Sequence, residues 1–228
     1  MIMWNFLSLS NNYYSMKRFI NIVIFMICAC EMNAQQVISQ ISENGISINP
    51  SFVKQNLIYS STNFNVVSST ERIDTTLFGN IILNFANETP EEEFGFNVIN
   101  IRIGQNQLLN VKQDDLWSYM FNGRCTRDFS SFTFDKHFIP VNINATLSLV
   151  ICCGWPYGGE MPLLTIIAIT PDEAKVIYNR HAGITALEKS PFNMTIQTNI
   201  VEYNGDGTPM WAADIHRIYY DNGQFLYQ

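Results

Sequence analysis

Two apolar stretches, PVNINATLSLVICC at Pro140–Cys153 and LLTIIAIT at Leu163–Thr170, decide the fold. Through residues 141–149 apolar and polar residues alternate, which places them on opposite faces of a strand. The sequence then becomes apolar on both faces, over residues 149–153 and again over 163–169. A strand that is apolar on both faces is covered on both sides. We therefore predict two strands at the centre of the fold.

The rest of the chain repeats the two-residue period. Asn97–Ile103 and Phe192–Ile200 alternate in the same way, and Asn222-Gly223 is a strong hairpin signal near the end. The chain is therefore predicted to be all-β, mainly antiparallel, with a β-sandwich or barrel-like architecture. At most two short helices are expected, over 35–43 and 114–121, the second with Asp114 as its cap.

Residues 1–34 have the layout of a bacterial secretory signal. Lys17 and Arg18 form a positive region, and an apolar run over 19–29 follows that is too short to span a bilayer. Residues 1–15 have no export character, so translation is expected to begin at Met16. We predict an exported protein of the periplasm, the outer-membrane surface or the extracellular space, with no transmembrane helix after the signal.

The signal can be processed in two ways. Cleavage after Ala34 leaves Gln35 as the first residue and is the preferred alternative. Ile27-Cys28-Ala29-Cys30 resembles a lipoprotein box, in which Cys30 would carry a lipid anchor, although Cys28 departs from the usual residue.

Removal of residues 1–34 leaves 11 basic against 19 acidic residues, a net charge of −8. An acidic surface repels phosphate backbones, so no nucleic-acid partner is expected. Residues 35–228 are predicted to form a single β-rich domain. The polar, acidic segment 87–93 and Pro171 are the alternative boundaries at which that domain would divide into two subdomains.

Three cysteines, Cys125, Cys152 and Cys153, remain after export. Adjacent strand residues face opposite ways, so a disulfide between Cys152 and Cys153 would need a strained turn. Either one can pair with Cys125 more easily. The alternative, three buried thiols that act as small hydrophobic side chains, is equally consistent with the sequence.

The loop between the two central strands holds the candidate binding residues. Trp155 and Tyr157 stand at alternate positions in a glycine-rich loop without a lysine, so the loop is not a phosphate-binding loop. Their rings, together with Glu160 and Trp211, can present a surface to a sugar. Packing of one ring against the end of the fold is the simpler explanation, because large aromatic side chains are usually part of the core.

No catalytic motif, metal-ligand spacing or cofactor motif stands out. Asp214 and His216 share a strand face and can form an acid–base pair, while His137 and His181 stand alone. A non-catalytic module that binds a glycan or a protein partner is the first hypothesis. The second is a hydrolase that uses two of Asp114, Asp115, Glu160 and Asp214. The third is an envelope structural or assembly subunit whose strand edges add to another chain.

Overall fold

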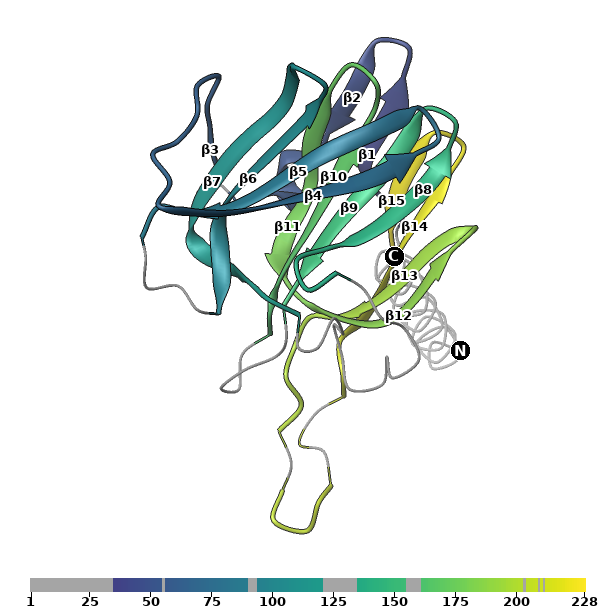
Figure 1. Cartoon of the computed structure of the whole chain (residues 1–228). Helices are drawn as coiled ribbons and strands as arrows, with labels where there is room; N and C mark the ends of the chain where they lie inside the picture. Colours follow the sequence, from purple (N-terminus) through teal and green to yellow (C-terminus); the bar gives the residue numbers. More distant parts are fainter. Residues whose placement is uncertain are drawn as a thin grey trace, which may run out of the picture. The chain divides into compact units, whose positions relative to one another are not determined.

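The computed structural model describes residues 35–54, 56–89, 94–120, 135–154, 161–202, 204–208, 210 and 212–228. Most of them lie in antiparallel strands that form three sheets, which we name A, B and C (Figure 1). Within this part of the chain the one helical segment is a single 3₁₀ turn at Pro50–Phe52. The prediction of an all-β, antiparallel fold is confirmed.

Sheet A has six strands in the order β12-β13-β14-β15-β1-β2. In that order they span Gly183–Lys189, Phe192–Gln197, Ile215–Asp221, Gln224–Tyr227, Gln36–Ser42 and Gly45–Ile48. The Asn-Gly hairpin signal lies between β14 and β15, where Asn222 and Gly223 both have positive φ, as a tight turn of this kind requires.

Sheet B has four strands in the order β11-β10-β9-β8, which span Ala174–His181, Leu163–Ile169, Leu147–Cys153 and Ile139–Asn144. Sheet C has five strands in the order β3-β7-β6-β5-β4, which span Ile58–Tyr59, Asn106–Ser118, Gly95–Ile103, Gly79–Asn87 and Ser68–Thr76. Residues Val37–Tyr227, which hold nearly all of these strands, form one compact unit.

Sheet B is the middle layer, and both of its faces are covered. Every residue of β9 and β10 is buried. Ile151 and Ile166 pack in an apolar cluster with sheet A, whereas their neighbours Val150 and Ile167 pack in a second cluster with sheet C. The prediction that these two strands lie centrally is thus confirmed, and the sandwich is a double one, with one core on each side of sheet B.

The predicted helix at 114–121 is wrong where the structure describes it, because residues 114–118 continue β7. Lys112 pairs with Val98 and Trp117 pairs with Phe96, so residues 113–116 of β7 stand opposite Asn97 alone. This bulge keeps residues 113–116 in the strand without separate partners on β6. It also buries Trp117 completely, and that burial outweighs the local preference for a helix. The other predicted helix, over 35–43, is wrong as well, since Gln36–Ser42 is β1.

Among the described residues, no helix is long and apolar enough to cross a membrane.

Candidate functional site

The residues that sequence reasoning singled out for binding, Trp155, Tyr157, Glu160 and Trp211, all lie outside the described residues. The described chain enters the segment that holds Trp155, Tyr157 and Glu160 at Gly154, whereas Trp211 belongs to a later segment. A Cβ at this position would collide with the side chain of Ser118, at the end of β7, so glycine is the residue that fits here. The loop site therefore stays a prediction.

The two cysteines of β9 face opposite cores, as their adjacency predicted. Cys153 belongs to the cluster with sheet A, and Cys152 belongs to the cluster with sheet C. Burial raises the pKa of the Cys152 thiol far above its usual range, which removes the thiolate that a nucleophile needs. Cys125 and Cys30 lie outside the described residues, so the disulfide and the lipid anchor also stay predictions.

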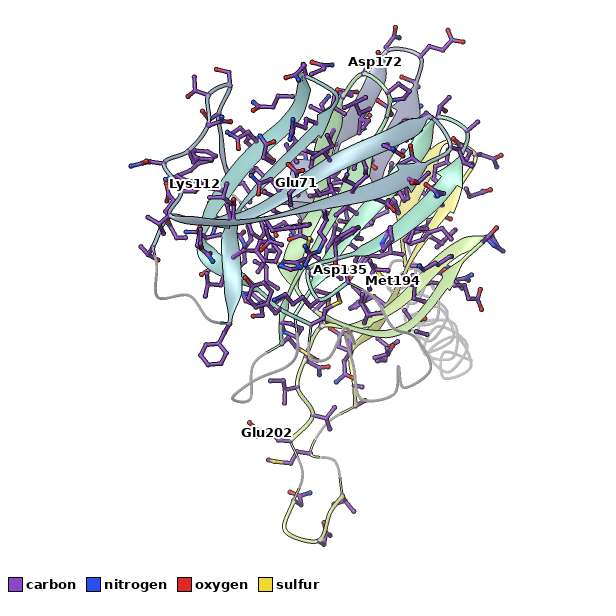
Figure 2. All side chains as sticks on the ribbon, viewed as in Figure 1. Glu71, Lys112, Asp135, Asp172, Met194 and Glu202 are labelled. Atoms are coloured by element: carbon purple, nitrogen blue, oxygen red, sulfur yellow. The ribbon has the colours of Figure 1, made fainter. Side chains whose placement is uncertain are left out.

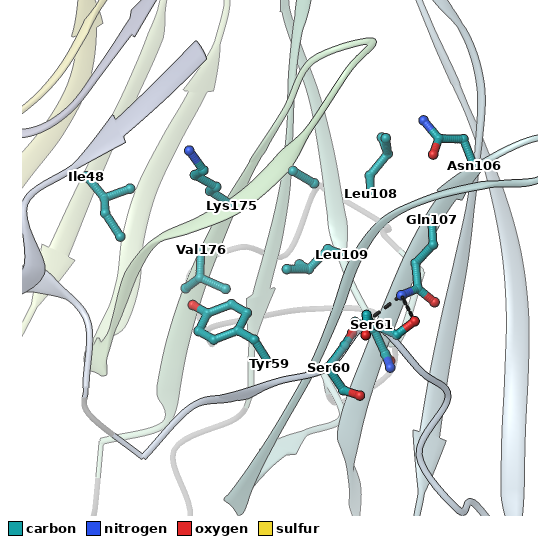
Figure 3. Close-up of a pocket in the computed structure, with 12 residues that line it drawn as sticks. Ile48, Tyr59, Ser60, Ser61, Asn106, Gln107, Leu108, Leu109, Lys175 and Val176 are labelled. Carbon is teal, nitrogen blue, oxygen red and sulfur yellow. Dashed lines mark hydrogen bonds between the residues drawn. The ribbon is translucent and has the colours of Figure 1, made fainter. Parts of the chain in front are cut away.

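The described surface contains a groove of about 720 Å³ where edge strands of the three sheets meet (Figure 3). Tyr59 of β3 lies beside Val176 of β11, with Leu109 of β7 and Ile48 of β2 also on the lining. The Tyr59 side chain is 53% exposed although it stands between apolar neighbours. This volume lies within the usual range of small-molecule sites, and an exposed ring in such a place can stack on a flat ligand.

The segment that carries Tyr59 is held in place by side-chain amides. Gln107 donates through Nε2 to the carbonyl oxygens of Ser60 and Ser61, both at 3.4 Å, and accepts from Asn100 at 2.9 Å. Asn110 donates to the carbonyl oxygen of Thr62 at 2.7 Å. These bonds fix the backbone just after Tyr59, which carries the ring at the groove.

Polar groups border the apolar floor of the groove. Ser61 and Asn106 are exposed on the lining, and Lys175 lies across from them on β11 (Figure 3). The Lys175 ammonium donates to the carbonyl oxygen of Ile46 at 2.7 Å and pairs with Glu173 at 2.9 Å. Among the described lining residues there is no carboxylate, histidine or cysteine. The lining can thus form hydrogen bonds and stack on a ligand.

The three histidines lie at separate places, and two of them pair with an aspartate. His216 Nε2 is 3.0 Å from Asp214 Oδ1, which confirms the predicted neighbourhood, and its ring stacks on Tyr227. A hydrogen bond from Thr198 lowers the pKa of Asp214, so this carboxyl is a poor proton donor at neutral pH. His181 is exposed; its Nδ1 donates to the carbonyl oxygen of Met161, and its Nε2 accepts from Lys54 at 2.8 Å.

His137 is buried in the core between sheets B and C, with 1% of its surface exposed. Its Nδ1 is 2.6 Å from Asp135 Oδ1, and Asp135 Oδ2 accepts from Arg72 Nε at 2.5 Å. The Phe85 ring stacks on the imidazole, whose Nε2 has no hydrogen-bond partner. Burial lowers the pKa of His137, against the opposing effect of Asp135, so the ring is neutral at pH 7.

A chain of buried hydrogen bonds runs through the same core. The Trp117 indole N–H donates to Thr165 Oγ1 at 2.7 Å, and that hydroxyl donates to Asn179 Oδ1 at 2.5 Å. Asn179 Nδ2 donates to Gln113 Oε1 at 3.3 Å. At the surface above it, Asp115 accepts from Lys54 and Asn56, both at 3.3 Å. These groups bind one another and hold the β7 bulge against sheet B.

The chain matches no model of a known protein family, no curated protein and no solved structure.

Sequence reasoning missed the groove because its walls come from four separate strands. The one local signal was Ile58-Tyr59, an apolar pair followed by the polar residues Ser60 to Asn63. Such a pair does not distinguish an exposed ring from a buried one.

Proposed function

We propose that the chain is an exported, non-catalytic binding module that holds a glycan in the groove between β3, β7 and β11. The observation that carries this proposal is the exposed Tyr59 ring, fixed beside an open groove with an apolar floor and polar borders. A sugar ring has apolar C–H faces and hydroxyl edges, and this combination fits such a surface. The signal-like residues 1–34 support export to the cell envelope, with Cys30 as the alternative point of lipid attachment.

A hydrolase has less support from the described carboxylates. Asp114 and Asp115 lie on sheet C, whereas Asp214 precedes a strand of sheet A. Asp115 is bound by Lys54 and Asn56, and Asp214 by Thr198 and His216. A glycosidase needs two carboxyl groups that face one bond from a short distance. The groove that could hold a sugar has no carboxylate on its described lining.

The test is a thermal-shift screen against neutral oligosaccharides, followed by calorimetric titration of the oligosaccharide that gives the largest shift. Tyr59→Ala should weaken binding about tenfold or more, which corresponds to about 1.4 kcal/mol. The melting temperature without ligand should hardly change, because the removed ring is half exposed. Tyr59→Phe keeps the ring and should retain most of the affinity.

Two matched variants locate the site. Phe94→Ala removes a ring that is 79% exposed and does not line the groove, so it should leave the affinity unchanged. Trp155→Ala removes the ring predicted from sequence alone. Loss of binding in Trp155→Ala with full binding in Tyr59→Ala would move the site to the loop. Absence of any saturable shift would reject the glycan as the ligand.

A further inference from the structure

We propose that β4 is a self-complementary edge through which two copies of this chain pair, so that sheet C continues from one copy into the other. β4 is the last strand of sheet C and pairs with β5 alone among the described strands. The groove borders β3, at the opposite edge of the sheet, so the two surfaces are separate. The occupant we propose is a second copy, for three reasons.

The first reason is the direction of the backbone groups. Thr76 and Gly79 flank the two-residue turn between β4 and β5, and such a pair exchanges both backbone hydrogen bonds. Even-numbered residues of β4 therefore bond to β5, and odd-numbered residues point their N–H and C=O groups away from the sheet. The Thr75 carbonyl oxygen, which accepts from Asn142 of β8 at 3.4 Å, agrees with this parity. Ile73 belongs to the outward-pointing set.

The second reason is the apolar surface along this edge. Ile73 is 63% exposed at the middle of β4, Val67 is 58% exposed just before the strand, and Leu77 is 67% exposed just after it. A two-fold axis at Ile73 sets it opposite its own copy and brings Leu77 towards the end of β4 of the second copy that Val67 precedes. One apolar stripe would then be buried across the junction, while each chain alone leaves it in water.

The third reason is the charge pattern, which favours an axis at Ile73 over axes at the charged residues Glu71, Arg72 and Asp74. With the axis at Ile73, Arg72 faces Asp74 of the second copy, and symmetry repeats the pair. Axes at Glu71, Arg72 or Asp74 would instead set like charges directly opposite each other, which is destabilising. Within its own chain Arg72 donates through Nε to Asp135 and through Nη1 to the Glu71 carbonyl oxygen. Glu71 of β4 and Asp135, which accepts from Arg72, are labelled in Figure 2.

Sedimentation equilibrium of the full chain, from about 1 µM to about 300 µM, is the first test, a range suited to weak contacts. We expect a reversible monomer–dimer equilibrium in the wild type. Ile73→Lys sets two ammonium groups opposite each other and should remain a monomer throughout, with an unchanged circular dichroism spectrum because Ile73 is exposed. A wild type that is monomeric at about 300 µM overturns the proposal, as does an Ile73→Lys variant that still dimerises.

Disulfide trapping tests the register directly. Residues directly opposite each other in an antiparallel pair have Cα atoms close enough for a disulfide. Under mild oxidation Ile73→Cys should give a reducible covalent dimer. Ser69→Cys lies on the same strand edge, but it faces Leu77 of the second copy and should give none. Equal cross-linking of the two variants, or none in Ile73→Cys, contradicts pairing centred on Ile73.

Discussion

The two cores on either side of sheet B differ in chemistry, although the same strands build both. The core towards sheet A is a continuous cluster of aliphatic and aromatic side chains. The core towards sheet C also holds Thr165, Asn179, Gln113 and His137, all buried and polar. An apolar core tolerates substitutions that keep its total volume. A buried polar group, in contrast, destabilises the folded state unless its hydrogen-bond partner is present. The core between sheets B and C should therefore tolerate fewer substitutions than the core between sheets B and A.

Adjacent isoleucines on β10 compare the two cores most directly. Ile166 faces sheet A, Ile167 faces sheet C, and both are completely buried. Ile166→Ala and Ile167→Ala should each lower the free energy of unfolding by about 3 kcal/mol, because each leaves a cavity. Urea unfolding measures both. A near-zero effect of either variant would mean that its face of sheet B is not covered in solution.

Removal of one hydroxyl should show how the core towards sheet C depends on exact partners. Thr165→Val keeps the shape of the side chain but leaves the Trp117 indole N–H and Asn179 Oδ1 without their hydrogen-bond partner. We expect a loss of about 2 kcal/mol in urea unfolding. Thr185→Val, which removes a half-buried hydroxyl from β12 in sheet A, is the matched control and should cost less than about 1 kcal/mol. Equal losses would mean that the buried Thr165 hydroxyl depends on its partners no more than a half-buried hydroxyl does.

The buried His137 should make stability depend on pH. Its pKa in the folded state is lowered below 6.5, so the unfolded state binds the proton first as pH falls. Stability should be complete above pH 6.5 and should decline below it, down to the lowered folded pKa, by at most about 1.4 kcal/mol per pH unit. The pKa of Asp135 is also lowered, so its contribution is lost only in more acidic solution, below about 3.8.

Urea midpoints at pH 7.5 and pH 5.5 measure this effect. His137→Gln should reduce the difference between the two midpoints, since the buried titrating group is gone. His181→Gln, at an exposed position, should leave the difference in place. The same dependence in His137→Gln and the wild type would exclude His137 as its source.

The sequence predicted that β9 and β10 lie centrally because a strand covered on both faces has a local signature. It failed at 114–121 because Leu116, Tyr119 and Met120 recur at helical spacing in the sequence, whereas residues 114–118 continue β7. It did not find the groove, because Tyr59, Leu109 and Val176 come together only when the sheets stack. The number of layers was equally hidden, since alternation shows which residues are covered but not which sheet covers them.

The strand order of sheet A also has a kinetic consequence. β1 lies next to β15, and β2 lies next to β1, although more than 160 residues separate Ile48 from Ile215, the first residue of the β14–β15 hairpin. Pairing over such a separation is slow, because the chain loses the entropy of loop closure before any contact between these strands stabilises it. Until β14 and β15 arrive, β9 and β10 lack part of one covering layer and expose apolar strand surface. Refolding from urea should therefore compete with aggregation, with a yield that falls as the protein concentration rises.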